Sequence, residues 1–229
     1  MRDGKINANE LLEIPVMKSM LDSLSDKTII DLGCGNGSMS RYFIEKGAKK
    51  VLGLDISNNM LKEASMMNNL DEITYQNLPL ENLDTIKEKF DMAYSSLAFH
   101  YIEDYEKLIK DIYNLLNDNG LLLFSQEHPL VTAPILNGVN KYLEVNDKRY
   151  YLISDYNNNS KREKLWYNDV IVKYHRNFPV IINTLIEQGF EILEIRESQA
   201  DKKIIEIVDK YKYQSDRPYF LFIKARKKD

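Results

Sequence analysis

The sequence predicts an α/β fold with a central, mostly parallel sheet, and two observations carry this prediction. Short apolar segments with the length of buried strands alternate with segments that have apolar residues at helical spacing. In addition, residues 28–37 read Thr-Ile-Ile-Asp-Leu-Gly-Cys-Gly-Asn-Gly, so an apolar run passes directly into three glycines at alternate positions. A strand, a glycine turn, a helix and a second strand make a βαβ unit, and ligands of such sheets bind at the carboxyl ends of the strands.

The first part of the chain contains the elements of this unit in order. Seven apolar residues between positions 11 and 21 predict an N-terminal helix, with Pro15 near its middle or marking a break. A buried strand follows at 28–32, and residues 38–46 have helical spacing and end at Gly47, a typical helix cap. The second strand ends at Asp55, and the next helix has Met60 among the apolar residues of one face.

The rest of the chain continues the alternation. Phe90 opens a strand, and Asp104 can cap a helix whose apolar face ends near Asn119 and Gly120. The next strand occupies 121–125, directly after Gly120. A helix is predicted at 179–188, and the segments 190–195 and 219–223 have the pattern of the last two strands.

Composition limits the classes of function. The chain has 229 residues, which is room for one large domain or for one domain with a cap. The net charge of −4 argues against a nucleic-acid partner, because phosphate contacts need a basic surface. No apolar stretch approaches the roughly 20 residues of a membrane span, and the N-terminus has no apolar signal-peptide core. The single cysteine, Cys34, excludes an internal disulfide, so a cytoplasmic location is expected.

The glycine loop and Asp55 together predict a cofactor that contains a nucleoside. Glycines let a ligand approach the backbone, and a carboxylate at the end of the second strand can accept both hydroxyls of a ribose. A dinucleotide-binding loop has the spacing G-x-G-x-x-G. Here Ser38 stands at the third position of that pattern and Gly37 comes one residue earlier, which gives G-x-G-x-G instead.

These segments resemble the class I S-adenosylmethionine-dependent methyltransferases. The run Asp-Leu-Gly-Cys-Gly-x-Gly at 31–37 is similar to the first motif of that family, and 53–60 is similar to the second. The strands opened by Phe90-Asp91 and by Gly120 resemble the fourth and fifth motifs, and 95–101 and 124–129 resemble a bacterial branch that acts on small molecules. The resemblance covers nearly the whole chain. It implies a doubly wound, Rossmann-like α/β fold with seven strands, and S-adenosylmethionine as the cofactor of a cytoplasmic enzyme.

The resemblance also implies which residues hold the cofactor. In the family, the acid of the second motif binds the ribose, and the methionine of that motif lies against the adenine. The implied cofactor-binding residues are Asp31, Gly33, Cys34, Gly35, Gly37, Asp55, Ile56, Met60, Leu80, Glu81, Ser95 and Ser96. One position departs from the family, because Pro79 stands where an acid usually contacts the adenine. The N–H of Leu80 or the carboxylate of Glu81 would then take that contact.

The segment 130–178 is too long for a simple connection between core elements, and such insertions are usually functional. It contains eight of the 24 aromatic residues and has a net charge of +3, while the remainder of the chain has −7. We therefore expect four parts: an N-terminal helical lid at 1–24, a cofactor-binding core at 25–129, a substrate cap inserted after the fifth strand at 130–178, and the C-terminal part of the core sheet at 179–229. The aromatic residues either pack the cap's own core or wall an acceptor pocket with a basic rim.

Methyl transfer from a sulfonium needs alignment, exclusion of water and removal of one proton from the acceptor. Histidine suits proton removal near neutral pH, and all three histidines follow strands or end the cap. His100 is the first candidate for the base and His128 the second, although each could instead have a structural role. The histidines with Glu127 could also bind a metal, but no two of them have helical ligand spacing, so no metal is expected.

The expected partner is a small-molecule methyl acceptor with an aromatic or anionic part. Its acceptor atom, which could be oxygen, nitrogen, sulfur or carbon, is open, as is the choice between monomer and homodimer. The candidate substrate contacts are Tyr101, Trp166, Tyr174, His175 and Arg176. Two alternatives remain: a non-catalytic protein or partner subunit that binds S-adenosylmethionine, and a nicotinamide-dependent oxidoreductase.

Overall fold

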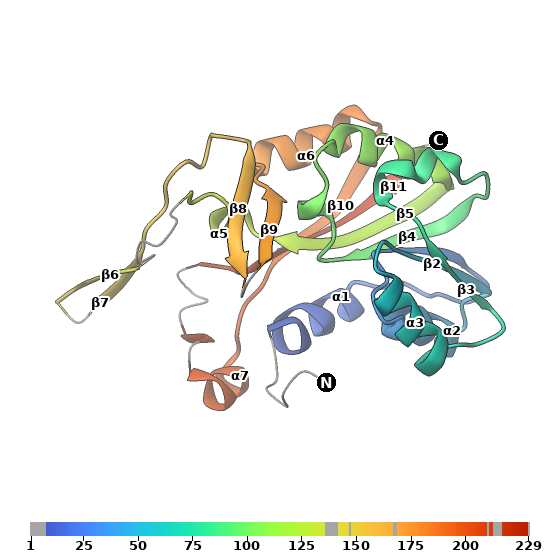
Figure 1. Ribbon diagram of the computed structural model, residues 1–229, viewed down its shortest axis with the longest axis horizontal. Coiled ribbons are helices and arrows are strands. Elements are labelled where there is room, and N and C mark those ends of the chain that lie inside the picture. The colour runs from blue at the N-terminus through green and yellow to red at the C-terminus, as the bar shows by residue number, and fades with distance from the viewer. Residues whose placement is uncertain are drawn as a thin grey trace.

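The computed structural model describes residues 8–135, 142–146, 148–166, 169–209, 211–212 and 217–228. Its centre is a seven-stranded sheet in the order β10-β11-β5-β4-β1-β2-β3 (Figure 1). The strands are β1 (Thr28–Leu32), β2 (Lys50–Asp55), β3 (Ile73–Asn77), β4 (Phe90–Ser96), β5 (Leu116–Glu127), β10 (Phe190–Glu197) and β11 (Phe220–Lys227). All neighbouring pairs are parallel except those that β11 makes with β5 and β10. The predicted doubly wound, mostly parallel seven-stranded sheet is therefore confirmed.

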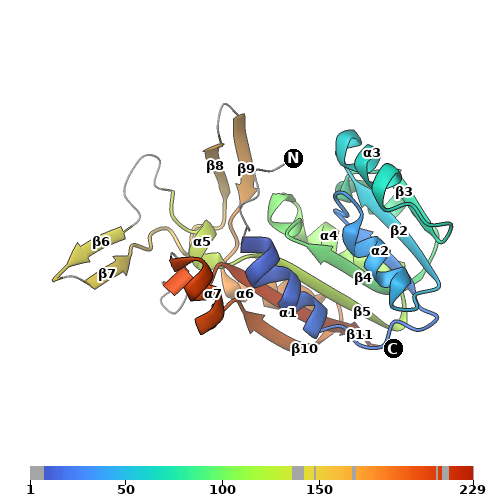
Figure 2. The same ribbon diagram turned by 90° about the horizontal axis from the view of Figure 1, so that it is seen from below.

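Helices cover both faces of the sheet (Figures 1 and 2). One face packs against α4 (Tyr105–Leu115) and α6 (Phe178–Glu187), and the other packs against α1 (Ile14–Ser19), α2 (Ser38–Glu45) and α3 (Asn58–Met67). The buried core is divided in the same way, because successive residues of a strand point to opposite faces. Thus Ile30 contributes to the cluster under α4 and α6, and Ile29 to the cluster under α1 and α2.

Two helices differ from their predicted bounds for local reasons. The N-terminal helix is divided into a π-helix at Asn9–Glu13 and α1, with Pro15 in the first turn of α1, where its missing N–H breaks no hydrogen bond. Helix α4 begins as predicted, since the Asp104 side chain accepts the N–H of Lys107. It ends at Leu115 rather than near Gly120, because the chain enters β5 at Leu116 and the pairing of β5 with β4 absorbs a bulge there.

The segment after β5 forms a short helix and two antiparallel hairpins. Helix α5 (Pro129–Thr132) comes first, followed by β6 (Tyr142–Val145) with β7 (Lys148–Tyr151), and by β8 (Lys161–Trp166) with β9 (Asp169–Tyr174). The β6–β7 hairpin extends away from the sheet, while β8–β9 stands beside the carboxyl end of β5 (Figures 1 and 2). Strand β7 ends at Tyr151, so Leu152 and Ser154 lie beyond it although they continue the alternation of Tyr150.

Three short elements complete the described fold. The 3-10 helix η2 (Leu80–Thr85) follows β3, η3 (Phe99–Tyr101) follows β4, and α7 (Lys202–Ile207) follows β10. None of the helices within the described ranges combines the length and the apolar character needed to cross a membrane.

Candidate functional site

The glycine loop connects β1 to α2 at the carboxyl edge of the sheet. The N–H groups of Gly33 and Cys34 both donate to the carbonyl of Leu54, at 2.8 Å each, which ties the loop to the end of β2. Gly35 has a φ of +55°, and a Cβ built on it would meet no atom within 4 Å, so its backbone borders open space. A Cβ on Gly37 would instead lie 2.2 Å from the Tyr75 hydroxyl. Gly37 is therefore needed for packing, whereas Gly35 leaves room for a ligand against the chain.

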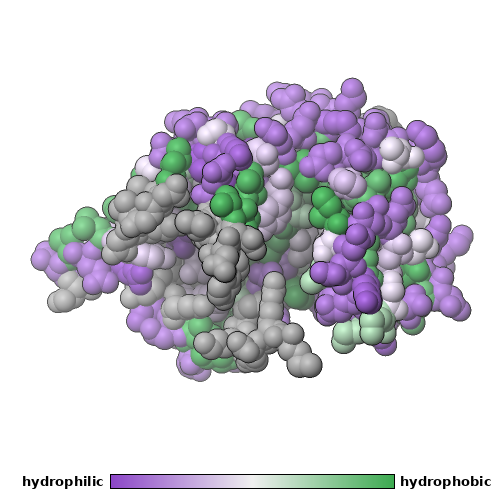
Figure 3. Space-filling view, viewed as in Figure 1, coloured by the Kyte–Doolittle hydropathy of each residue, from purple (hydrophilic) through white to green (hydrophobic). Residues whose placement is uncertain are grey.

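Asp55 fixes the loop from the neighbouring strand. One carboxylate oxygen accepts the N–H of Gly35 at 2.9 Å, and the other accepts the N–H of Ser57 at 2.7 Å. Each carboxylate oxygen can accept two hydrogen bonds, so both keep capacity for a ribose hydroxyl. Ile56 directly follows Asp55 and Met60 lies in the first turn of α3, with exposed fractions of 70% and 40%, so apolar surface is available near this end of β2. Figure 3 shows apolar side chains among mostly hydrophilic ones in the middle of this face, where the surface is hollowed beside α2 and α3.

Asp31 is a buried acid below the loop. The Ser40 hydroxyl donates to its carboxylate at 2.6 Å. Burial, opposed by the Ser40 hydrogen bond and helped by the nearby charge of Asp55, raises the pKa of Asp31 to about 7. Burial also raises the pKa of the Cys34 thiol, with Asp31 and Asp55 acting in the same direction. Cys34 is therefore a protonated thiol in the loop and not a nucleophile.

The segment after β3 lies on the expected adenine side. Pro79 precedes η2, whose first residue is Leu80. The first N–H groups of a helix have no intrahelical acceptor, so the position of Leu80 suits the predicted contact with an adenine nitrogen. The Leu80 side chain is buried, whereas Glu81 is exposed and its backbone carbonyl accepts the ammonium of Lys107.

The two serines at the end of β4 are both engaged. The Ser95 hydroxyl donates to the carbonyl of Leu32 at 2.8 Å and is fully buried. The Ser96 hydroxyl donates to the carboxylate of Glu13 at 2.9 Å, and Ser125 on β5 donates to the same oxygen at 2.5 Å. Glu13 has an exposed fraction of 0%. Sequence reasoning did not select Glu13, although an acid inside an otherwise apolar helical run is a signal that could have found it.

His100 lies in a polar group at the carboxyl ends of β4 and β5. Its Nδ1 accepts the N–H of Glu127 at 3.4 Å, and its ring centroid lies 4.3 Å from that of Tyr101. Lys173, from β9, pairs with the Glu127 carboxylate at 2.5 Å and lies 5.5 Å from the centroid of the Tyr101 ring. Burial, helped by the nearby cations Lys173 and Arg176, lowers the pKa of His100 to about 4, and the negative charge of Glu127 opposes this shift. The imidazole is therefore neutral at physiological pH.

His128 and His175 have both ring nitrogens occupied. In His128, Nδ1 accepts the N–H of Leu130 at the start of α5, and Nε2 lies 2.9 Å from the carboxylate of Glu197. In His175, Nδ1 lies 2.7 Å from the Thr132 hydroxyl, and Nε2 lies 2.9 Å from the carbonyl of Tyr156. The structure therefore does not bring the three histidines together. Within the described residues, no group of three His, Cys, Asp or Glu side chains is placed to hold a metal ion.

Arg176 holds the segment after β4. Its buried guanidinium donates to the backbone carbonyls of Phe99, Ile102, Glu103 and Tyr174. The Tyr174 hydroxyl donates to the Glu103 carboxylate at 3.2 Å, in the same region. These contacts dock β9 onto η3. Trp166 belongs to β8, but its side chain lies outside the described part of the structure.

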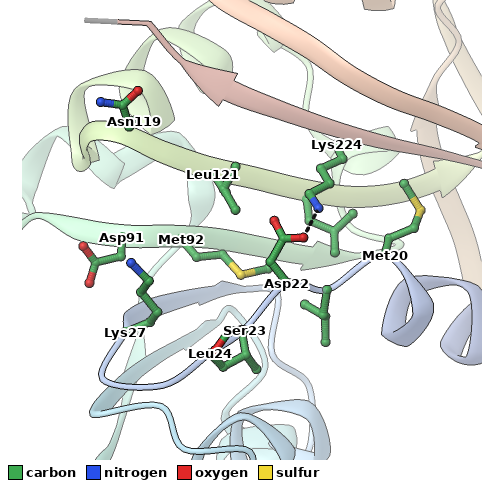
Figure 4. Close-up of a pocket in the computed structure, with 12 residues that line it drawn as sticks. Met20, Asp22, Ser23, Leu24, Lys27, Asp91, Met92, Asn119, Leu121 and Lys224 are labelled. Carbon is green, nitrogen blue, oxygen red and sulfur yellow. Dashed lines mark hydrogen bonds and ion pairs between the residues drawn. The ribbon is translucent and has the colours of Figure 1, made fainter.

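A small cavity lies at the opposite, amino edge of the sheet (Figure 4). Lys27, Asp91 and Asn119 line it, and an ion pair of 2.7 Å between Asp22 and Lys224 borders it. Ligands of doubly wound sheets bind at the carboxyl ends of the strands, so this cavity is not the cofactor site.

Comparisons with known proteins show the family to which the chain belongs. The family described as a methyltransferase domain matches residues 30–124, from β1 into β5. A crystal structure of an S-adenosylmethionine dependent methyltransferase from Mesorhizobium loti has a TM-score of 0.87 and 34% identity, and the match covers 96% of this chain and 98% of that one. The chain belongs to the S-adenosylmethionine-dependent methyltransferases.

Two further relatives extend the likeness. An uncharacterized protein of Haemophilus influenzae is 38% identical over 99% of this chain and 91% of its own length. The juvenile hormone acid O-methyltransferase of Bombyx mori is 31% identical over 70% of this chain and 60% of its own length. The present chain therefore matches less than two thirds of the length of the Bombyx mori enzyme.

The cofactor of this methyltransferase is S-adenosylmethionine, and the residues at the carboxyl edge fit it. The backbone of Gly35 borders open space, and the Asp55 carboxylate next to it has capacity for ribose hydroxyls. Three acids lie near this edge: Glu13 at the end of the N-terminal π-helix, Asp31 on β1 and Asp55 at the end of β2. Negative charge there suits a cofactor that carries a sulfonium and an ammonium.

The buried carboxyl of Asp31 makes the stability of the cofactor-free methyltransferase depend on pH. In the folded protein Asp31 keeps its proton up to about pH 7, whereas in the unfolded chain it ionises near 3.8. The protonated Asp31 therefore contributes to the free energy of unfolding in full below about pH 4, and this contribution is lost as the pH rises through 7. At about 1.36 kcal/mol per pH unit, the loss is at most roughly 4 kcal/mol. Urea unfolding should give a lower free energy of unfolding at pH 8 than at pH 5.

Asp31→Asn should flatten this dependence, because an amide does not ionise. Glu45→Gln, which changes an exposed acid on α2, should keep the wild-type slope. An Asp31→Asn variant with the wild-type pH dependence would show that Asp31 ionises normally in the fold.

The contacts of Arg176 predict a structural role for its guanidinium. Arg176→Met leaves the buried carbonyl of Ile102 and the partly buried carbonyl of Glu103 without this donor, so the free energy of unfolding should fall by about 2–4 kcal/mol. Arg41→Met is the control, because Arg41 makes only an exposed pair with Glu45 beside a bond to a carbonyl, and its loss should cost less than about 1 kcal/mol. An Arg176→Met variant of unchanged stability that no longer binds its acceptor would instead assign Arg176 to the substrate.

Proposed function

We propose that this methyltransferase acts on a small-molecule acceptor that binds beside His100, under the β8–β9 hairpin. The observation that carries the proposal is the group of His100, Tyr101, Glu127 and Lys173 at the carboxyl ends of β4 and β5. When bound, S-adenosylmethionine would supply the methyl group of its sulfonium: the acceptor atom would bond to the methyl in line as the methyl–sulfur bond breaks, and a neutral thioether would remain. The protein then has to align the acceptor, exclude water and manage the acceptor's proton.

His100 is the proposed general base. Its lowered pKa, about 4, keeps the imidazole neutral at physiological pH. To act as the base, the ring has to carry its lone pair on Nε2 and its proton on Nδ1, which gives up the long, 3.4 Å hydrogen bond from the Glu127 N–H. The same low pKa predicts a particular pH profile for the wild-type enzyme. Protonation of His100 should leave kcat unchanged from about pH 6 to pH 9 and should lower it only as the pH approaches 4.

A second role for His100 follows from its hydrogen bond. A neutral imidazole has one donor and one acceptor nitrogen, and Nδ1 accepts the N–H of Glu127, so the proton is on Nε2. In this tautomer Nε2 can donate to an anionic oxygen of the acceptor. A carboxylate acceptor needs no base, because it is already ionised. The names of two relatives support this class: the Bombyx mori enzyme acts on juvenile hormone acid, and a Hamiltonella defensa enzyme is a malonyl-[acyl-carrier protein] O-methyltransferase.

The segment 130–178 supplies the proposed cover over the acceptor. It has a net charge of +3, and its Lys173 lies beside the Tyr101 ring, which is 44% exposed. An exposed aromatic ring next to a cation suits an acceptor with an aromatic or anionic part. Of the predicted substrate contacts whose side chains the structure describes, Tyr101 is the one with an exposed ring in this group. His175 and Arg176 would shape the pocket through the backbone that they hold.

The cofactor assignment predicts a measurable role for Asp55. Asp55→Ala should weaken S-adenosylmethionine binding by roughly 1.5–3 kcal/mol, because it removes hydrogen bonds to a charged group. Titration calorimetry measures this loss, and Asp71→Ala, which removes an exposed acid just before β3, is the control. Unchanged affinity in a folded Asp55→Ala variant would contradict the placement of the ribose.

The two roles of His100 predict different behaviour of its variants. If His100 is the base, His100→Ala and His100→Gln should both lower kcat by about 10²–10⁴-fold while cofactor affinity is kept. If Nε2–H only orients an anionic acceptor, His100→Gln should retain much of the activity, because the amide still donates.

The assay is transfer of labelled methyl to pooled metabolites, with the carboxylic acids tested separately. A loss at His128→Ala with none at His100→Ala would move the role to His128, and no transfer to any acceptor would favour a non-catalytic binding protein.

A further inference from the structure

Glu13 is a buried acid on the N-terminal segment. It is the last residue of the π-helix Asn9–Glu13, and Leu12 and Met17 beside it are buried in the apolar core. Its Oε1 accepts the hydroxyls of Ser96 and Ser125, which face each other on β4 and β5. The carboxylate is therefore held at the carboxyl edge of the sheet by two neighbouring strands.

This position adjoins the glycine loop. Strand β4 pairs with β1 on its other side, and β1 leads into the loop. Just past Ser96, the Cβ of Ala98 lies 2.8 Å from the place where a Cβ on Gly33 would stand. Glu13 thus lies one strand away from the loop, on the same edge as the proposed ribose ligand Asp55.

The second oxygen of Glu13 is buried and has no hydrogen-bond partner within the described part of the chain. Burial raises the pKa of Glu13, and the two serine hydroxyls only partly offset this effect. The hydroxyl of Tyr94, on the same face of β4, is likewise without a described partner, and burial and the charges of Glu13 and Asp31 raise its pKa. A buried carboxylate is costly unless a cation or hydrogen-bond donors match it, so these residues are suited to a positively charged ligand.

We propose that the carboxylate of Glu13 binds a cationic centre in the methionine part of S-adenosylmethionine. This inference rests on the cofactor of the family, which carries an α-ammonium and a sulfonium. The free oxygen of Glu13 then gains a charge-assisted partner. The same contact docks the N-terminal segment over the cofactor, since the Glu13 side chain joins this segment to Ser96 on β4 and Ser125 on β5.

Three ligands separate the two cationic centres. S-adenosylmethionine carries both, S-adenosylhomocysteine carries only the ammonium, and 5′-methylthioadenosine carries neither, while all three contain the ribose. Glu13→Gln keeps the shape of the side chain and an acceptor for the serines. It should weaken S-adenosylmethionine binding by roughly 10- to 100-fold in calorimetry and change 5′-methylthioadenosine binding by less than about twofold. An equal loss for S-adenosylhomocysteine assigns the contact to the ammonium, and a loss confined to S-adenosylmethionine assigns it to the sulfonium.

Controls separate this contact from a purely structural role. Glu10→Gln changes an exposed acid on the same π-helix and should bind all three ligands as the wild type does. Ser125→Ala keeps the carboxylate but removes one of its anchors, so its loss for S-adenosylmethionine should be smaller than that of Glu13→Gln. Equal weakening of all three ligands by Glu13→Gln, or no weakening, overturns the proposal. A failed cofactor assignment looks different, because Asp55→Ala would then leave the binding of all three ligands unchanged.

Discussion

The carboxylate of Asp55 connects the elements that form the cofactor site. It accepts the N–H of Gly35 from the glycine loop and the N–H of Ser57 from the turn that starts α3. The loop is tied a second time to β2, through the Leu54 carbonyl. Because these bonds are made by backbone N–H groups, the shape of the loop depends on the strand beside it as well as on its glycines. The parallel pairing of β1 with β2 brings the two together, so the site requires the sheet.

Acidic and basic side chains lie at different places along the carboxyl edge of the sheet. Asp31, Asp55 and Glu13 are acids, and burial raises the pKa of Asp31 and of Glu13. The cations of the described site, Lys173 and Arg176, lie on the acceptor side, near His100. The three acids therefore suit the cationic part of the cofactor, whereas Lys173 is paired with the Glu127 carboxylate and Arg176 is bound to backbone carbonyls.

The sequence predicted the parts of this arrangement that depend on local pattern. The glycine spacing and the acid at the end of the second strand are readable because both belong to one βαβ unit. Contacts between distant residues were not readable in the same way. Glu13 meets Ser125 across 112 positions, and Arg176 meets the carbonyl of Ile102 across 74, and no periodicity records such pairs. For the same reason, the contacts of His128 with Glu197 and of His175 with Tyr156 could not be foreseen.

A crystal structure with bound S-adenosylhomocysteine tests the central claim most directly. The account predicts the ribose hydroxyls within hydrogen-bond distance of the Asp55 carboxylate, the homocysteine part against Gly33 and Gly35, and the adenine beside Leu80. The thioether sulfur should face the side of β4 and β5 where His100 lies. A ribose bound away from Asp55, or a ligand seated at the amino edge of the sheet, would contradict it.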